Sequence, residues 1–130
     1  MSFLDIDVSN AEEPKAVPGG EEYKIRISGA ITNINKNGNP YFMPRFDVVD
    51  HPNSKDLTDY IPLPYEGMSE KDKVKIEWRI RMFKSAFEIP LDGSIELDDL
   101  IGKEAWAILS LKEDEAYGEQ NGVSKYIAPK

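Results

Sequence analysis

From Tyr23 onward, apolar and polar residues alternate along the chain, which is typical of a β-strand with one buried face. The apolar positions share one parity and the polar positions have the other: Tyr23, Ile25, Ile27 and Ile31 against Lys24, Arg26 and Ser28. Residues 37–40 (Asn-Gly-Asn-Pro) predict a turn, because Gly and Asn tolerate positive φ and Pro lacks the N–H of a strand ladder. The first segment is therefore predicted to be a strand that ends before a tight turn.

The next two segments also predict strands. Residues 41–49 alternate again, with one set expected inward and the other outward: Phe42, Phe46 and Val48 against Tyr41, Met43, Arg45 and Asp47. Residues 51–54 (His-Pro-Asn-Ser) predict a second turn. Residues 57–63 then predict a third strand, which Pro62 and Pro64 shorten because proline cannot donate to a ladder.

A helix is predicted after the third strand. Ser69 and Asp72 have the spacing of a capping box, so the helix should begin near Glu70. At about 100° per residue, four apolar side chains fall within about 60° of arc and form a core-facing stripe: Ile76, Ile80, Phe83 and Phe87. Residues 74–82 also alternate as a strand would, but the cap and the length of the segment favour the helix.

The remaining segments predict two more strands. Pro90 ends the helix, residues 95–101 predict a turn or short helix that Gly102 closes, and residues 105–111 and 123–127 predict strands joined by a loop at residues 118–122. Three strands, a helix and two strands form the element order of an OB-fold, a five-stranded Greek-key barrel with one α-helix between strands 3 and 4. We therefore expect a mainly β, OB-fold-like chain, although ferredoxin-like and other α+β folds have similar element orders.

The charge of the chain is unevenly distributed. Its 130 residues, a length that suits one domain, contain 24 acidic and 16 basic residues, for a net charge of −8. This total argues against a nucleic-acid partner, whose phosphates attract Lys and Arg. However, residues 23–46 contain four basic and no acidic residues, and residues 71–84 contain six basic and two acidic ones. Two basic segments inside an acidic chain permit a local positive surface, although such runs are also common on solvated faces.

Composition argues against enzymatic chemistry. The chain has no cysteine and a single histidine, His51, which removes disulfides and thiolate chemistry and makes histidine-based catalysis or metal binding improbable. The acidic residues Asp47, Asp50, Asp56 and Asp59 lack the ordered spacing of a calcium-binding loop, so no metal and no cofactor are expected. We find no phosphate-binding loop and no nucleophile motif. We therefore expect a protein that is not an enzyme.

The first twenty residues differ in composition from the rest. Residues 1–20 are predicted to be a flexible acidic N-terminal arm and linker, and residues 21–130 a single domain. The arm has some apolar character from Phe3, Leu4, Ile6 and Val8, so it could dock on its own domain or on a neighbour. It lacks the features of a secretory signal, and no apolar run is long enough for a membrane span. We therefore expect no membrane partner.

Seven short, loosely defined sequence patterns occur in order over nearly the whole chain. They are an acidic N-terminus containing Asp and Phe, then VPGGEEY (17–23), NGNP (37–40), RFDVVD (45–50), WRIRMF (78–83), LDDLIGK (97–103) and NGVSKYIAP (121–129). In this order the chain resembles a family of small phage-encoded proteins that are similar to single-stranded-DNA-binding proteins and lie among phage replication and recombination genes. No catalytic signature is among the patterns.

The resemblance implies an OB-fold that binds single-stranded DNA during phage replication or recombination, in the cytoplasm of an infected bacterium. It also implies phage replication or recombination proteins as partners. Bacterial single-strand-binding proteins usually finish in an acidic, Phe-ending tail that recruits partners, whereas this chain finishes Ala-Pro-Lys. We therefore expect no recruiting role for the C-terminus, and the acidic arm could instead compete for the binding face.

Binding a single strand without base specificity requires cations for phosphates and exposed aromatic faces for stacking. Strand parity, the acid-free segment and the hairpin tip predict eight nucleic-acid-binding residues: Lys24, Arg26, Lys36, Tyr41, Arg45, Tyr60, Trp106 and Tyr126. Lys125 and Tyr126 have opposite parities, so only one of them can face the ligand. An exposed Tyr on a strand is often only a good β-former, and Trp106 could instead be covered by the helix or a loop.

The predicted helix has a second apolar arc opposite its core-facing stripe. Val74, Trp78 and Met82 form this arc, which predicts either a helix buried on two sides or a surface for a partner protomer. We favour the partner surface, and with it a homo-oligomer. The same arc supports an alternative function, an acidic protein-interaction module that regulates or loads a replication or recombination enzyme.

Overall fold

The computed structural model describes residues 4–129, so Phe3 and Lys130 lie outside the described part. Within it, six strands and two helices follow in the order β1 (Glu22–Ile34), β2 (Pro40–Val48), β3 (Leu57–Thr58), β4 (Ile61–Pro62), α1 (Glu70–Ala86), α2 (Leu97–Leu100), β5 (Glu104–Asp114) and β6 (Gly118–Ile127). The prediction of a mainly β chain with a helix before the last two strands is therefore confirmed. None of the described helices is both long and apolar enough to cross a bilayer.

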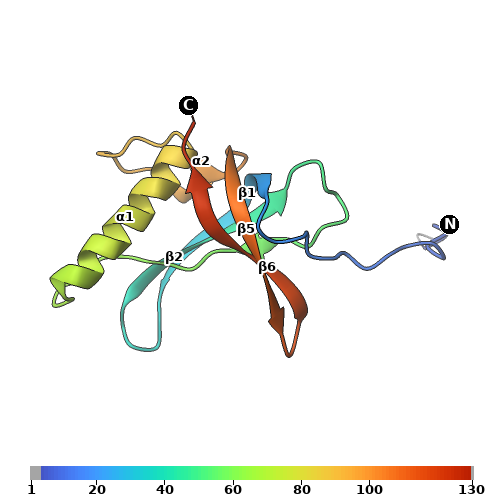
Figure 1. The fold of residues 1–130 in the computed structure, drawn as a ribbon, viewed down its shortest axis with the longest axis horizontal. Coiled ribbons are helices and arrows are strands. Elements are labelled where there is room, and N and C mark those ends of the chain that lie inside the picture. The colour runs from blue at the N-terminus through green and yellow to red at the C-terminus, as the bar shows by residue number, and fades with distance from the viewer. Residues whose placement is uncertain (1–3, 130) are drawn as a thin grey trace.

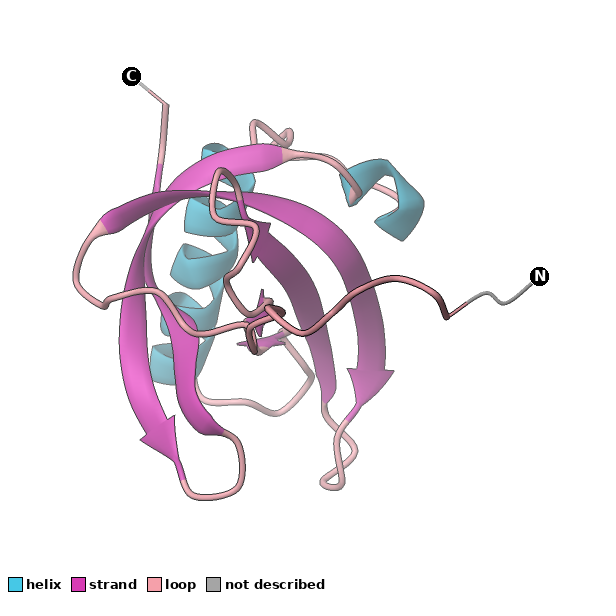
Figure 2. Ribbon diagram, turned by 90° about the vertical axis from the view of Figure 1, so that its right-hand side faces the viewer, coloured by secondary structure: helices cyan, strands magenta, loops and turns pink. Residues whose placement is uncertain are grey.

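All strands belong to one antiparallel sheet with the order β3-β2-β1-β5-β6, and β4 pairs with β2 as well. Figure 2 shows that the strands curve strongly, and Cα atoms of the two edge strands β3 and β6 come within 8 Å of each other. No strand pairing joins these edges among the described residues, so the sheet curls without closing.

The predicted third strand is interrupted. Regular pairing with β2 exists only at β3 and β4, and Asp59 and Tyr60 separate them. Backbone hydrogen bonds from Asp59 N to Pro44 O and from Leu63 N to Pro40 O, each 3.1 Å, keep the whole segment alongside β2. The break arises where the Asp59 side chain turns into the interior. The residue beside it on β2 is Pro44, which has no N–H to donate to the ladder.

A β-bulge in β1 changes which residues face the core. Ile27 pairs with Phe46 and Gly29 with Arg45, which leaves Ser28 as an extra residue on β1. Because one extra residue reverses the parity of all that follow, Ile31 is 51% exposed instead of lying inward with Ile27. The regular alternation that groups Ile31 with Ile27 therefore ends at the bulge.

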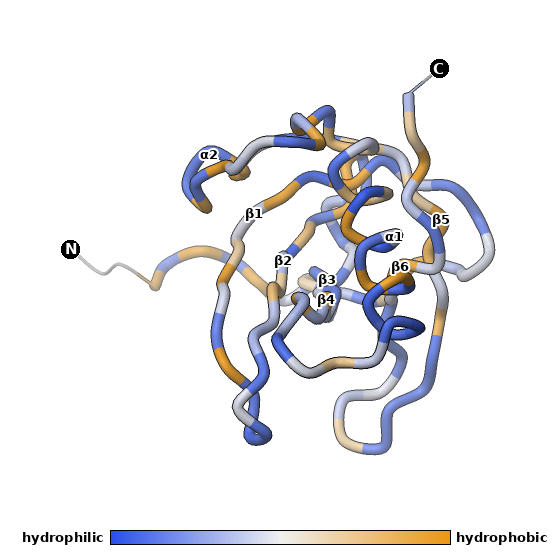
Figure 3. Tube along the Cα trace, turned by 90° about the vertical axis from the view of Figure 1, so that its left-hand side faces the viewer, coloured by the Kyte–Doolittle hydropathy of each residue, from blue (hydrophilic) through white to orange (hydrophobic). Residues whose placement is uncertain are grey.

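Helix α1 covers the opening of the curled sheet, beside β4 and β6 (Figure 3). Its predicted start is confirmed, because the Asp72 N–H donates to Ser69 Oγ at 3.2 Å. Phe83 and Phe87 insert into the core, with ring centroids 5.3 Å from Phe42 and 5.8 Å from Phe46, respectively. The helical interpretation of residues 74–82 is thus confirmed.

The last hairpin differs from its prediction. Strand β6 begins at Gly118, so the expected loop at residues 118–122 is already strand. The turn lies before it, where Asp114 Oδ1 accepts the N–H groups of Ala116 (2.8 Å) and Tyr117 (3.0 Å). An aspartate that accepts from the residues two and three positions ahead closes a tight turn, which allows β6 to start early.

The chain before β1 is held to the domain from Lys15 onward. The Lys15 N–H donates to Asn53 O and the Lys55 N–H donates to Lys15 O, each at 3.0 Å. The side chain of Val17 is buried, and its N–H donates to Asn121 Oδ1 at 2.9 Å. Residues 4–14 are exposed and extend away from the sheet, on the side opposite α1 (Figure 1).

Candidate nucleic-acid interface

The outer face of β2 carries the polar and aromatic side chains that strand parity predicts. Phe46 and Val48 are buried, whereas Tyr41, Met43 and Arg45 lie on the opposite side of the strand. Arg45 is exposed, and Tyr41 and Met43 are half-buried. The predicted outward orientation of these three residues is confirmed.

Two of the predicted aromatic residues meet on this face. The rings of Tyr41 and Tyr60 stack with their centroids 4.8 Å apart and their planes at 27°. Tyr60 remains 43% exposed, and its hydroxyl accepts a hydrogen bond from Asn35 Nδ2 at 3.2 Å. This bond links the aromatic pair to the β1–β2 turn, which carries Lys36.

Apolar side chains extend the pair along the strands. Ile31 lies directly across from Met43, and Asn33 lies across from Tyr41. We call the set of Ile31, Tyr41, Met43 and Tyr60 the tyrosine platform. Sequence reasoning missed Ile31 and the bridging Asn35, although Gly29 inside a strand pattern is the local signal of a bulge.

The predicted strand cations all form ion pairs. Lys24 Nζ lies 3.3 Å from Glu104 Oε1, Arg26 lies 3.0 Å from Asp47 Oδ2, and Arg45 lies 3.2 Å from Asp56 Oδ2. Hydrogen bonding and the negative charge of Asp47 raise the pKa of Arg26 above its ordinary value. The acid-free stretch of sequence therefore becomes a surface of neutralised pairs, because the acids arrive from neighbouring segments.

Lys36 differs from these three cations. It is exposed in the turn between β1 and β2, and it makes no ion pair with any of residues 4–129. Its turn adjoins the tyrosine platform through the Asn35–Tyr60 hydrogen bond. Lys36 is therefore the predicted cation that is available near the platform without breaking an existing pair.

Trp106 and Lys24 lie at the other end of β1. They are cross-strand neighbours, and Trp106 is 50% exposed, so it is not covered by the helix. Asn33 lies nine positions after Lys24 on β1, about 30 Å along the strand at ~3.3 Å per residue. The hollow beside Trp106 is also lined by Glu22, Glu88 and Glu104. The structure does not bring Trp106, Lys24 and the tyrosine platform together.

Tyr126 is not on the surface. It pairs with the inward-facing Ala107 on β5, is 3% exposed, and its ring centroid lies 5.4 Å from that of Phe83. The hydroxyl donates to Asp59 Oδ2 at 2.6 Å, and burial followed by the charge of Asp59 raises the pKa of Tyr126 well above its ordinary value. Its prediction as a nucleic-acid-binding residue is therefore wrong, because the ring belongs to the core.

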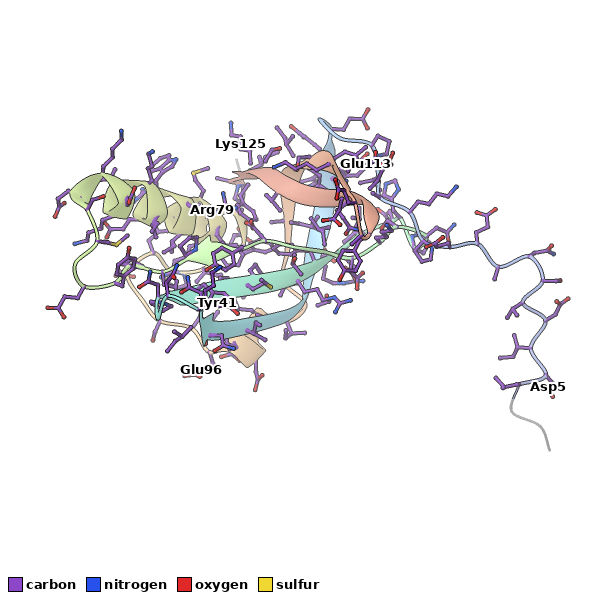
Figure 4. All side chains as sticks on the ribbon, turned by 90° about the horizontal axis from the view of Figure 1, so that it is seen from below. Asp5, Tyr41, Arg79, Glu96, Glu113 and Lys125 are labelled. Carbon is purple, nitrogen blue, oxygen red and sulfur yellow. The ribbon has the colours of Figure 1, made fainter. Side chains whose placement is uncertain are left out.

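Asp59 is the centre of a small buried polar cluster. Its second oxygen accepts a hydrogen bond from Arg79 of α1, which points from the helix toward the sheet (Figure 4). The cluster of Asp59, Arg79 and Tyr126 thus joins the β3–β4 connection to α1 and β6. Nowhere in the described part of the chain are three or more acidic or histidine side chains arranged to hold a metal ion.

Helix α1 presents the predicted second apolar arc to solvent. Val74 is 63% and Trp78 is 61% exposed. Met82 is half-buried because it contacts the hydrophobic core, so it does not belong to this exposed surface. Val74 and Trp78 instead share a shallow groove with Pro64 and Leu91.

Comparison with known proteins identifies no relative: no family model matches this chain, and no curated protein matches it.

Proposed function

We propose that this protein binds single-stranded DNA through the tyrosine platform and catalyses no reaction. The observation that carries the proposal is the stacked Tyr41–Tyr60 pair, which faces solvent beside Arg45 and the Lys36 turn. Bases stack on exposed aromatic rings regardless of sequence, and nearby cations attract the phosphates. The platform and its neighbours offer both kinds of contact on one face.

The strand order supports the same proposal. Strand β1 pairs with both β2 and β5, and the curled sheet brings β3 and β6 near each other. An OB-fold is a partly open barrel that binds oligonucleotides on its second and third strands, on the loop between its first two strands and on the loop between its last two. If the chain is an OB-fold, the tyrosine platform and Lys36 occupy the first two of these positions. The sequence resemblance to phage-encoded proteins favours a role in phage replication or recombination.

The ion pairs on the sheet limit how electrostatic the binding can be. Lys24, Arg26 and Arg45 each already contact a carboxylate, so few phosphates would gain a new cation. The slope of log K against log salt is about −0.7 per phosphate neutralised on a single strand. We therefore expect a shallow salt dependence, with stacking as the larger contribution to affinity.

The proposal is tested by titrating fluorescently labelled oligo(dT) with the protein and following anisotropy at low and high salt. Replacing Tyr60 by Ala should weaken binding about 5- to 150-fold, because the loss of one stacked base costs about 1–3 kcal/mol. Tyr41→Ala should weaken binding within the same range. Lys36→Ala should weaken it less and should reduce the salt dependence.

Tyr65→Ala is the matched control, because Tyr65 is an exposed tyrosine in the segment between β4 and α1, outside the platform. It should bind oligo(dT) as the unmodified protein does. An absence of oligo(dT) binding at low ionic strength would overturn the proposal. Equal losses in Tyr60→Ala and Tyr65→Ala would also overturn it, because the platform would then have no special role.

A second candidate function rests on the exposed face of α1. Trp78 and Val74 are large apolar residues in contact with solvent, which marks surfaces that bind other proteins. An accessory factor that loads or inhibits a replication or recombination enzyme would use such a face. A stoichiometric protein partner, recovered together with a failure to bind nucleic acid, would favour this function over the first.

A further inference from the structure

The groove on α1 combines exposed apolar residues with unpaired cations. Val74, Trp78, Pro64 and Leu91 supply its apolar surface. At about 100° per residue, Lys71, Lys75 and Arg81 lie within about 60° of Trp78 around the helix. None of these three cations forms an ion pair with another described residue, in contrast to the cations on the sheet. Glu77, which also lines the groove, offsets only part of this positive charge.

An occupant that fits this groove would present apolar and acidic side chains together. The apolar residues would cover Trp78 and Val74, and the carboxylates would lie at the rim, within reach of the long Lys and Arg side chains. Residues 4–8 of this chain, Leu-Asp-Ile-Asp-Val, have that chemistry. We call them the 4–8 segment.

The spacing of the 4–8 segment matches the groove. In an extended conformation its apolar residues share one face and its aspartates share the other. Ile6 and Val8 would then lie about 6.6 Å apart, close to the ~6 Å rise between Val74 and Trp78 along a helix. Both Ile6 and Val8 are largely exposed in the structure. Hydrogen bonds from Ser9 lower the pKa of Asp7.

The 4–8 segment and the groove lie on opposite sides of the molecule. Figure 1 shows α1 at one end and the N-terminal segment extending from the other, and Figure 4 shows Asp5 far from the helix that carries Arg79. The backbone bonds of Lys15 hold the base of this segment on the far side. A segment on one side and its groove on the other suit a contact between two copies.

We infer that the 4–8 segment of one copy docks in the α1 groove of a second copy. Such a contact is heterologous, because it joins two different surfaces and leaves one of each unused at the ends. Repeated contacts therefore build an open row of copies or a closed ring. The contact involves neither the tyrosine platform nor nucleic acid, so it stands or fails independently of the proposed function.

The experiment measures self-association of the full chain, without nucleic acid, by sedimentation velocity over a range of concentrations and salt. The unmodified protein should form a ladder of assemblies that shortens at high salt. Two variants should each raise the dissociation constant at least about tenfold: Ile6→Asp combined with Val8→Asp, and Trp78→Ala. All three substitutions are on exposed side chains, and circular dichroism checks that each variant is folded.

Mixing the two variants gives the sharpest result. The segment variant (Ile6→Asp with Val8→Asp) keeps an intact groove, and the groove variant (Trp78→Ala) keeps an intact 4–8 segment. The mixture should therefore form 1:1 dimers and nothing larger. Trp106→Ala is the matched control, because Trp106 is a comparably exposed tryptophan outside the groove, and it should assemble like the unmodified protein. An excess of a peptide with the sequence of residues 4–14 should compete for the groove and dissociate the assemblies, whereas a scrambled peptide should not.

Three results would overturn the inference. The unmodified chain could stay monomeric at all concentrations. Trp78→Ala could abolish association while the segment variant retains it, which would mean that two grooves face each other. Finally, Trp78→Ala could weaken oligo(dT) binding and leave self-association unchanged, which would assign the groove to nucleic acid.

Discussion

At the scale of single residues, Asp59 has the most consequential position. Its two carboxylate oxygens accept from Tyr126 of β6 and Arg79 of α1, and only 7% of the residue is exposed. A buried carboxylate is tolerated when its charge is paired and its oxygens are hydrogen-bonded. The cluster therefore links three elements through one side chain.

We predict that the free energy of unfolding falls as the pH rises above about 10. Burial and Asp59 raise the folded-state pKa of Tyr126 above the unfolded value, so this stabilisation is complete below pH ~10 and is lost as the pH climbs toward the folded pKa. The slope should approach about 1.4 kcal/mol per pH unit for this group. Urea unfolding at a series of alkaline pH values measures it.

Tyr126→Phe should flatten this slope, and at neutral pH it should cost about 1–2 kcal/mol because Asp59 loses a donor. Tyr117→Phe is the control, since an exposed tyrosine should leave the slope unchanged. Tyr23 should keep some slope in both variants, because burial followed by the charge of Glu21 raises its pKa too. An identical slope in the Tyr126 variant would contradict the prediction.

At the scale of elements, local signals predicted where structure begins better than how it is arranged. Ser69 marks the start of α1, and alternation marks β1 and β2, because caps and strand parity act between residues close in sequence. The bulge at Ser28 reverses that parity and places Ile31 on the surface. The predicted binding face therefore lacks Ile31. Tyr126 was misassigned because its parity depends on its register against β5, which its own segment does not encode.

The end of α1 shows a mismatch between residue and conformation. Glu88 has a φ of 56°, and the Ile89 N–H donates to Lys84 O at 2.8 Å, as in a helix ending that usually places Gly at the left-handed position. Glu88→Gly should therefore raise the free energy of unfolding by about 1 kcal/mol, because it removes the strain of a side chain at positive φ. Urea unfolding measures the change.

Glu88→Gln separates conformation from charge at this position. It keeps the side chain and the strain, so its stability should stay within about 0.5 kcal/mol of the unmodified protein. A gain of equal size in both variants would show that charge near the helix C-terminus, rather than φ, is responsible.

At the scale of the whole molecule, charge is separated along the long axis. Residues 1–14 contain four acidic and no basic residues, whereas α1 at the other end carries the unpaired cations. The net charge of each sequence segment does not predict the neutralised pairs on the sheet, because the partners of Arg26 and Lys24 are distant in sequence. It also does not predict that the acidic and basic segments lie at opposite ends of the molecule. The acid-free segment therefore overstated the positive charge of the sheet.

Removing residues 1–14 changes the net charge from −8 to −4. We predict that the truncated chain binds a short oligo(dT), which holds one copy, more tightly at low salt, because less negative charge repels the phosphates. The gain should vanish at about 0.5 M salt, where charges are screened beyond a few ångströms. Anisotropy titrations at the two salt concentrations measure it.

A long polynucleotide should give the opposite result if copies join through the 4–8 segment. The truncated chain would then lose contacts between neighbours and bind long poly(dT) more weakly than the full chain does. A truncated chain that shows no change on the short oligonucleotide would contradict the charge argument. A truncated chain that binds the short oligonucleotide but shows no loss on poly(dT) at about 0.5 M salt would show that the contact between copies does not act on a polynucleotide.

The gap between β3 and β6 affects where the sheet opens locally. The backbones of these edges do not pair, and the hydrogen bond between Asp59 and Tyr126 spans the gap instead. Opening of this seam breaks no backbone pairing between β3 and β6, but it must break the Asp59–Tyr126 bond and the bonds from Lys55 Nζ to Tyr117 O and Glu119 O. Amide protons along the seam should therefore exchange with solvent before those in the centre of the sheet. While the seam is open, the edges of β3 and β6 can each pair with a strand of another chain. By opposing this opening, the Asp59–Tyr126 hydrogen bond should reduce strand exchange and aggregation.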